Sequence, residues 1–381
     1  MNILGVGSII ATAAYQAAMR QAMVNAGHQF IISLDNPAAD WAKQNLPDLK
    51  FLQAGSNTPD QLIGDVKPDH IMVCLAGGGL AQNPWEWRMA LEAQKRGIPF
   101  SIHEDMSPTV LDIKNLPMFD KINPAQIFVA EQMSKDMLTE KGIAGENLIA
   151  VAGNPTWDEM AEFETKAARI EVRSKMGLKD TDKLVIFMGS KFQHIVCEEL
   201  DWTIAALNSV ANQFGIIMGT YYHPACPDWK ANPSTTQAPH GAYQAPFNAL
   251  DKMIRVLNDP ELRRRFKNQL EVLAAADLVF SWGSTLTLNT AQMSIPTVRL
   301  FTPENEKKAE TAGFPRPYRF PAVASGCQYG ANNLYQLIQV MPLLLDSKSE
   351  LVKTISINCA ANYPRTGLVA QNIVKAIEAL H

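Results

Sequence analysis

The fold class can be predicted from the stretch MNILGVGSIIATAAYQAAMRQAMVNAGHQFIISL (residues 1–34). Its apolar start, Met1–Val6, predicts a strand, and the segment 11–26, rich in Ala, Met and Gln, predicts a helix that ends at Gly27. A second strand is expected over Gln29–Leu34. Two strands joined by a helix of this length predict a parallel βαβ unit, because parallel neighbours need a long crossover connection.

The same alternation continues along the chain. Apolar, β-branched runs predict further strands at residues 70–75, 99–103, 126–129, 148–152, 183–188, 215–220, 278–281 and 297–301. A charged helical segment at 154–175 interrupts the series and marks a domain boundary. We therefore expect an α/β protein with two Rossmann-like, doubly wound domains facing a cleft. The expected limits are 1–160 for the N-terminal domain, 161–365 for the C-terminal domain, and 366–381 for a final helix that could pack back on the N-terminal domain.

The composition argues against a nucleic-acid-binding protein and against a membrane-spanning protein. The 381 residues include 34 Lys plus Arg and 38 Asp plus Glu, so a net charge of −4 provides no global field for nucleic acid, and membrane contact is at most peripheral. Five scattered cysteines without a CxxC pair indicate free thiols in a cytoplasmic protein. No uninterrupted apolar stretch of about 18 residues occurs, so a transmembrane helix is not expected.

Ligands of doubly wound sheets bind beyond the carboxyl ends of the strands, so the residues just after each predicted strand are candidates. Gly7 and Ser8 follow the first strand and would let a ligand approach the start of the next helix; a tight turn without a ligand is the alternative. Dinucleotide binding is not expected, because Ile10 replaces the third glycine of GxGxxG. Gly78 and Gly79, after residues 70–75, either leave room for a substrate or form a flexible loop.

The strand at 99–103 ends in titratable residues. His103 and Glu104, followed by Asp105, could supply a general base and a carboxylate that orients it. The alternative is that they cap the next segment or pair with nearby cations. Because adjacent strand residues face opposite ways, Glu104 and a neighbour can share the cleft only if the strand has ended.

The second half offers three similar positions. Ser190 and Lys191 follow the strand at 183–188, where the lysine could meet a phosphate or simply lie on the surface. His223, before Pro224, follows the strand at 215–220 and is either a site residue or structural. Three small residues then separate the strand at 278–281 from a helix expected near residue 286, where free backbone N–H groups could seat a phosphate or form an ordinary N-cap: Gly283, Ser284 and Thr285.

No metal ion or other cofactor is expected. Asp180-Thr181-Asp182 spells a DxD sequence, but it precedes a strand inside the charged turn KDTDK, which is typical of a solvated loop.

Several segments together resemble the GT-B superfamily of sugar-nucleotide enzymes, which includes glycosyltransferases and UDP-N-acetylglucosamine 2-epimerases. The resemblance spans most of the chain. It is carried by Ala26-Gly27-His28-Gln29-Phe30, Lys67-Pro68-Asp69, Gly97-Ile98-Pro99, the GNxxxD-like stretch 153–158, the segment 276–285 with Ile295-Pro296, and Asn362-Tyr363-Pro364 with Gly367. It implies that an acceptor binds the N-terminal domain, that a nucleotide-sugar donor binds the C-terminal domain, and that Glu104 belongs to an acidic catalytic set. His223-Pro224 is similar to a His-Pro motif of polyol-phosphate and capsule transferases in the same superfamily, whose His acts at the donor phosphate.

Departures from the epimerase pattern favour a transferase. Ala76 stands where the epimerases have an acidic catalytic residue, and Ser190 stands where they have a His. Asn289 and Thr290 occupy the place of an acidic residue for the ribose hydroxyls, which leaves the nucleotide open. We therefore expect a metal-independent, cytoplasmic glycosyltransferase that builds a surface polysaccharide or glycoconjugate on a carbohydrate or glycolipid acceptor. An epimerase-like isomerase or hydrolase, a CDP-polyol phosphotransferase and a catalytically silent binding protein remain alternatives.

Overall fold

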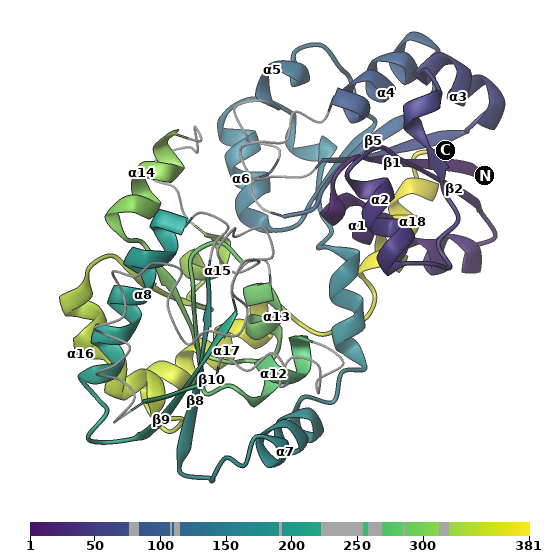
Figure 1. The fold of residues 1–381 in the computed structure, drawn as a ribbon. Helices are drawn as coiled ribbons and strands as arrows, with labels where there is room; N and C mark the ends of the chain where they lie inside the picture. Colours follow the sequence, from purple (N-terminus) through teal and green to yellow (C-terminus); the bar gives the residue numbers. More distant parts are fainter. Residues whose placement is uncertain are drawn as a thin grey trace. The chain divides into compact units, whose positions relative to one another are not determined.

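The computed structural model describes residues 1–75, 84–106, 109, 115–189, 193–221, 254–257, 269–284, 286–311 and 320–381 (Figure 1). They cluster into two compact units. The first unit takes its described residues from Met1–Glu162, Glu310–Pro321 and Arg365–His381, and the second takes them from Phe163–Ala309 and Ala322–Pro364.

The first unit is built on a parallel sheet of seven described strands in the order β3-β2-β1-β4-β5-β6-β7. The central strand β1 pairs with β2 on one side, where Asn2 lies opposite Gln29, and with β4 on the other, where Ile3 lies opposite His70. The strands are β1 Asn2–Gly7, β2 Gln29–Leu34, β3 Leu52–Gln53, β4 His70–Leu75, β5 Phe100–Glu104, β6 Gln126–Val129 and β7 Ile149–Val151.

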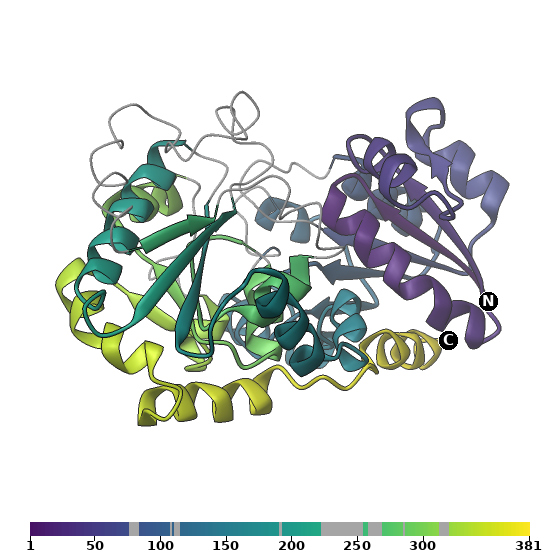
Figure 2. The ribbon, with the colours of Figure 1, turned by 60° about the horizontal axis from the view of Figure 1, so that its bottom comes forward.

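Helices cover both faces of this sheet. They are α1 Ile10–Asn25, α2 Ala38–Asn45, α3 Pro59–Val66, α4 Pro84–Lys95, α5 Leu116–Phe119, α6 Gln132–Glu140 and α18 Val369–Glu378, with 3₁₀ turns at Ala54–Ser56, Glu146–Leu148 and Pro155–Ala161. Figure 2 shows α1 in purple and α18 in yellow side by side, and the two helices pack against each other.

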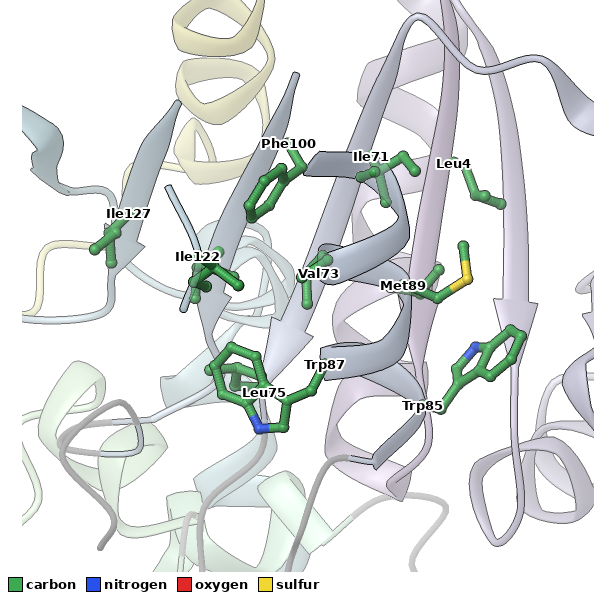
Figure 3. Packing of buried hydrophobic residues seen from close by; sticks show 14 of the residues in the cluster. Leu4, Ile71, Val73, Leu75, Trp85, Trp87, Met89, Phe100, Ile122 and Ile127 are labelled. Carbon is green, nitrogen blue, oxygen red and sulfur yellow. The ribbon is translucent and has the colours of Figure 1, made fainter. Parts of the chain in front are cut away.

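Alternation along the strands separates two buried clusters. In β4, Ile71, Val73 and Leu75 belong to the cluster under α4, whereas Met72 and Cys74 belong to the cluster under α1 and α18. Figure 3 shows the first cluster, with Trp85 and Trp87 on opposite sides of the first turn of α4. The helices that follow β1 and β4 therefore lie on opposite faces of the sheet.

The stretch 153–158, which carries part of the family resemblance, has a structural role in this unit. The Asn154 side chain donates a hydrogen bond to the backbone carbonyl of Asp105, just after β5. The Asp158 carboxylate accepts hydrogen bonds from the backbone N–H groups of Val369 and Ala370 at 2.9 and 2.8 Å. Those N–H groups begin α18, and an anionic cap at a helix N-terminus is favourable, so Asp158 fixes the C-terminal helix to this unit.

The second unit repeats the plan with a parallel sheet in the order β10-β9-β8-β11-β12-β13. Its strands are β8 Asp182–Met188, β9 Gly215–Tyr221, β10 Ile254–Leu257, β11 Leu278–Ser281, β12 Thr297–Leu300 and β13 Tyr329–Ala331. Its helices are α7 Thr165–Lys175, α8 Gln193–Asn208, α12 Gln269–Ala275, α13 Leu286–Gln292, α14 Pro303–Thr311, α15 Pro321–Ala324, α16 Leu334–Leu345 and α17 Glu350–Asn362. Asp182 of the DxD sequence accepts a hydrogen bond from the Lys179 backbone N–H, which closes the turn before β8.

The predicted fold class, α/β with two Rossmann-like units, is confirmed. The ten predicted strands all occur within one or two residues of their expected bounds, and β3, β10 and β13 were not predicted. Among the described residues, no helix has both the length and the apolar character needed to cross a bilayer. Cys74, Cys327 and Cys359 are buried free thiols.

The close approach of α1 to β1 makes Gly7 a sensitive position. A Cβ at Gly7 would lie 2.4 Å from Thr12 Oγ1 and 2.7 Å from Thr12 Cβ, whereas a Cβ at Gly64, on the exposed side of α3, would meet nothing within 4 Å. We predict that Gly7→Ala lowers the free energy of unfolding by about 1–3 kcal/mol through overpacking. The control Gly64→Ala is expected to raise it by about 0.5–1 kcal/mol, because alanine favours a helix. Urea unfolding measures both, and equal effects of the two substitutions would contradict this packing.

Candidate functional site

The turn after β1 is held rigidly at the carboxyl edge of the first sheet. The carbonyl of Gly7 accepts a hydrogen bond from the Asp35 backbone N–H at 3.0 Å, and the carbonyl of Ser8 accepts one from the Ala38 N–H at 3.1 Å. Thr12 Oγ1 lies against Gly7 and accepts a hydrogen bond from the Ile9 N–H at 3.1 Å, which caps α1. The absence of a side chain at Gly7 leaves room for Thr12, so packing explains this glycine. Contact with a ligand, the other role predicted from the sequence, stays a prediction.

Ser8 is joined to a buried carboxyl group. Its Oγ lies 2.7 and 3.0 Å from the two carboxylate oxygens of Glu86, which is in the first turn of α4. The Glu86 side chain is completely buried, and Ser8 keeps 5% of its surface exposed. The pair therefore connects the turn after β1 with the helix that follows β4.

Burial sets the charge of Glu86. Burial is the largest of the effects that together raise the pKa of Glu86 from 4.5 to about 7. The hydrogen bond from Ser8 Oγ and those from the backbone N–H groups of Glu86 and Ser8 act in the opposite direction, and the nearby Asp35 carboxylate makes the smallest contribution, an upward one. Glu86 is thus divided between its protonated and ionised forms near neutral pH. A group in this range can both accept and release a proton, which is the requirement for general acid–base chemistry.

Glu104 ends β5 and is 1% exposed. One of its oxygens accepts a hydrogen bond from the Ala130 backbone N–H and the other from Ser134 Oγ, both at 3.1 Å. Ser134 lies in the first turn of α6, so the carboxylate is held at the start of that helix. The catalytic role of Glu104 stays a prediction, and these contacts show how the fold positions it.

His103 is fully buried on the other face of the sheet. Its Nδ1 lies 3.0 Å from the Tyr15 hydroxyl, its Nε2 lies 2.7 Å from Ser101 Oγ, and its ring stacks on Phe128. Burial, reinforced by the neighbouring His70, holds the pKa of His103 well below its usual value, so the ring is neutral at pH 7. The structure does not bring His103 and Glu104 together, because adjacent residues of β5 point to opposite faces.

In the second unit, hydrogen bonds with Ser281 and Arg299 hold the turn after β11 in place. The backbone N–H of Ser284 donates to Ser281 Oγ at 3.3 Å, and α13 begins at Leu286, as expected. Arg299 of β12 is 3% exposed, and its guanidinium donates to the carbonyls of Trp282 and Ser284. Because the carbonyl of a trans peptide and the following N–H point in opposite directions, the N–H of exposed Gly283 points away from Arg299.

The remaining predicted site residues lie outside the described residues: Gly78, Gly79, Ser190, Lys191, His223 and Thr285. Within the described parts of the chain, no group of three or more His, Cys, Asp or Glu side chains is placed to hold a metal ion.

Glu86 was not among the site residues predicted from the sequence. The available signal was an acidic residue in the first turn of a helix that follows a glycine-rich loop at the end of a strand. An acidic residue there ordinarily interacts with the helix dipole, so only the structure distinguishes a buried Glu86 from a solvated one.

Similar solved structures identify the fold. No protein-family model and no curated protein sequence matches the chain. The UDP co-structure of S. aureus MnaA is 12% identical, with a TM-score of 0.66, and the match covers 99% of this chain and 95% of that one. A UDP-GlcNAc 2-epimerase from Methanocaldococcus jannaschii is 17% identical, with a TM-score of 0.63 and full coverage of both chains. A glycosyltransferase from Rickettsia africae is 14% identical, with a TM-score of 0.63 and coverage of 99% and 98%.

These structures are GT-B folds of sugar-nucleotide enzymes, and the chain has the same two-unit fold over its whole length. The resemblance stated from the sequence is therefore confirmed at the level of the fold.

The raised pKa of Glu86 predicts a pH-dependent stability difference for Glu86→Gln. Between pH 4.5 and 7 the unfolded chain loses the Glu86 proton while the folded protein keeps it, so the wild-type protein loses stability as pH rises. Relative to wild type, Glu86→Gln should gain about 3 kcal/mol between pH 4 and pH 8. Urea unfolding at both pH values measures the change, with Glu92→Gln on the same helix as the control. A difference between wild type and Glu86→Gln that is independent of pH would contradict the shift.

Proposed function

We propose that this chain is a GT-B glycosyltransferase that transfers sugar from a nucleotide-activated donor without a metal ion. The observation that carries the proposal is the fold shared along the whole chain with sugar-nucleotide enzymes, one of them bound to UDP. The first unit would bind a carbohydrate or glycolipid acceptor and the second unit the donor. Synthesis of a surface polysaccharide or glycoconjugate in the cytoplasm is the corresponding role.

The turn after β11 supports a donor site in the second unit. The backbone N–H of Gly283, an exposed residue, and the hydroxyl of the partly exposed Ser284 are the kinds of donors that bind phosphate oxygens. Arg299 donates hydrogen bonds to the carbonyls of Trp282 and Ser284. These carbonyl oxygens therefore compete less with an anion for the N–H groups of the turn. Lys191 and Thr285 are expected to join these groups at the departing diphosphate, and His223 to assist there.

Chemistry favours transfer over epimerisation. Ala76 cannot exchange a proton with a sugar carbon, and Ser190 cannot replace an imidazole acid or base near neutral pH. A UDP-sugar 2-epimerase-like activity is the second candidate, because several of the similar structures are named as such epimerases.

Nucleotide binding is the first test. We predict that one of UDP, GDP, CDP, CMP or dTDP raises the melting temperature without added metal. A ligand at about 100 times its Kd stabilises the folded state by roughly 2.7 kcal/mol. The nucleotide that gives the shift identifies the base of the donor, and no shift with any of them would contradict a donor site.

Product analysis separates the two activities. The sugar form of the binding nucleotide is incubated with and without a panel of saccharide acceptors, and the products are followed by proton NMR. A transferase leaves the donor unchanged at its second carbon and attaches the sugar to an acceptor. Epimerisation of the donor alone would overturn the transferase proposal in favour of the second candidate.

A further inference from the structure

Glu86 and Ser8 occupy the point of the first sheet where ligands of doubly wound proteins gather. The helices after β1 and β4, two adjacent strands, lie on opposite faces, so the chain diverges at the carboxyl ends of these strands. Ser8 follows β1, and Glu86 lies in the first turn of the helix after β4. The hydrogen bond between them links residues 78 positions apart in the sequence, at this point of divergence.

Among the described residues, the Glu86 carboxylate accepts hydrogen bonds from Ser8 Oγ and from the backbone N–H groups of Ser8 and Glu86 itself, yet burial outweighs them and disfavours its ionised form. Glu86 is completely buried, and its sequence neighbours Trp85 and Trp87 belong to the apolar cluster under α4. A glutamine could make the hydrogen bond with Ser8 without the cost of burying an ionisable group. Buried groups whose ionisation is displaced toward neutral pH are found preferentially at functional sites.

Ser8 and Glu86 differ in their exposure to solvent. Ser8 keeps 5% of its surface exposed and Glu86 keeps none, so of the two residues only Ser8 offers any surface to an incoming hydroxyl. The Ser8 hydroxyl can donate one hydrogen bond and accept others, whereas an ionised Glu86 can only accept. A proton can therefore pass from a ligand hydroxyl to Ser8 while the proton of Ser8 passes to Glu86, over an oxygen-to-oxygen distance of 2.7 Å.

We propose that Ser8 and Glu86 form a proton relay that deprotonates the hydroxyl group of a saccharide acceptor. This inference rests on the proposed function and deepens it. The acceptor oxygen forms a bond with the anomeric carbon of the donor, and the bond from that carbon to the diphosphate breaks. The leaving nucleoside diphosphate takes the electron pair of that bond. The acceptor proton moves to Ser8, whose own proton moves to Glu86, and the neutral carboxyl group later releases it to water.

Other titratable groups modulate the relay. Among the described residues, Asp35 after β2 and the Cys74 thiol of β4 interact electrostatically with Glu86. Cys74 is fully buried, and burial raises the pKa of its thiol well above the usual value, so it stays neutral at the pH of the reaction. Asp35 is a nearby negative charge, so neutralising it favours the ionised form of Glu86.

The test compares three variants of the full chain in a transfer assay that measures nucleoside diphosphate release as a function of pH. Glu86→Gln should lower kcat at least 100-fold and leave the nucleotide-induced melting shift intact, because the donor turn is untouched. Asp35→Asn should retain activity and move the acidic limb of the kcat/KM profile to lower pH. Glu92→Gln, the same change at a carboxylate of α4 that pairs with Lys95 and Arg96, should match wild type in kcat and in its pH profile.

The outcomes distinguish a failure of the relay from a failure of the proposed glycosyltransferase function. Absence of transfer by the wild-type enzyme with every donor and acceptor would overturn the proposed function, and the relay with it. Transfer by wild type that persists undiminished in Glu86→Gln would overturn the relay alone. An unmoved pH profile in Asp35→Asn would also overturn it, since a purely structural carboxyl group leaves that profile unchanged. If Glu86→Gln has a lowered melting temperature and binds no nucleotide, Ser8→Ala is tested in its place. The relay then requires Ser8→Ala to show the same loss of kcat.

Discussion

The hydrogen bond between Ser8 and the buried carboxyl group of Glu86 connects the fold of the first unit with its proposed chemistry. It requires Gly7 to let α1 approach β1, and it requires α4 to set its first turn over the carboxyl edge of the sheet. Burial of Glu86, opposed by its hydrogen bonds, brings its pKa to about 7, near neutral pH. Fold and proton chemistry thus depend on the same few contacts.

The second unit uses a buried charge differently. Arg299 is a cation that is always protonated, and it is compensated by backbone carbonyls and by the Gln328 side chain. Arg299 fixes the orientation of the turn after β11 by donating hydrogen bonds to the carbonyls of Trp282 and Ser284. The N–H of Gly283 therefore points away from the guanidinium. In the proposed transferase, the first unit removes a proton from the acceptor and the second unit binds the charge that develops on the diphosphate.

The sequence predicted the main strands because buried parallel strands are continuous apolar runs bounded by turns. It missed β3 and β13, which have two and three residues and carry too little pattern. Glu104 and the 281–284 turn could be proposed as site residues from the sequence because they lie at the carboxyl ends of predicted strands, and their roles stay predictions. The partnership of Ser8 with Glu86 was not predictable, since it joins distant segments and depends on which face of α4 is buried. The neutral state of His103 likewise follows from the packing of α1, which no local pattern encodes.

A site-specific titration of Glu86 shows whether its carboxyl group exchanges a proton near neutral pH. Carbon-13 labelling of the glutamate carboxyl groups allows each to be followed by NMR between pH 4 and pH 9, and the Glu86 signal is assigned by its loss in Glu86→Gln. The environment of Glu86 predicts a midpoint near pH 7, because burial raises its pKa to about 7. It also predicts a higher midpoint in Ser8→Ala, because the hydrogen bond from Ser8 stabilises the ionised form. A midpoint at the ordinary glutamate value, unmoved by Ser8→Ala, would contradict it.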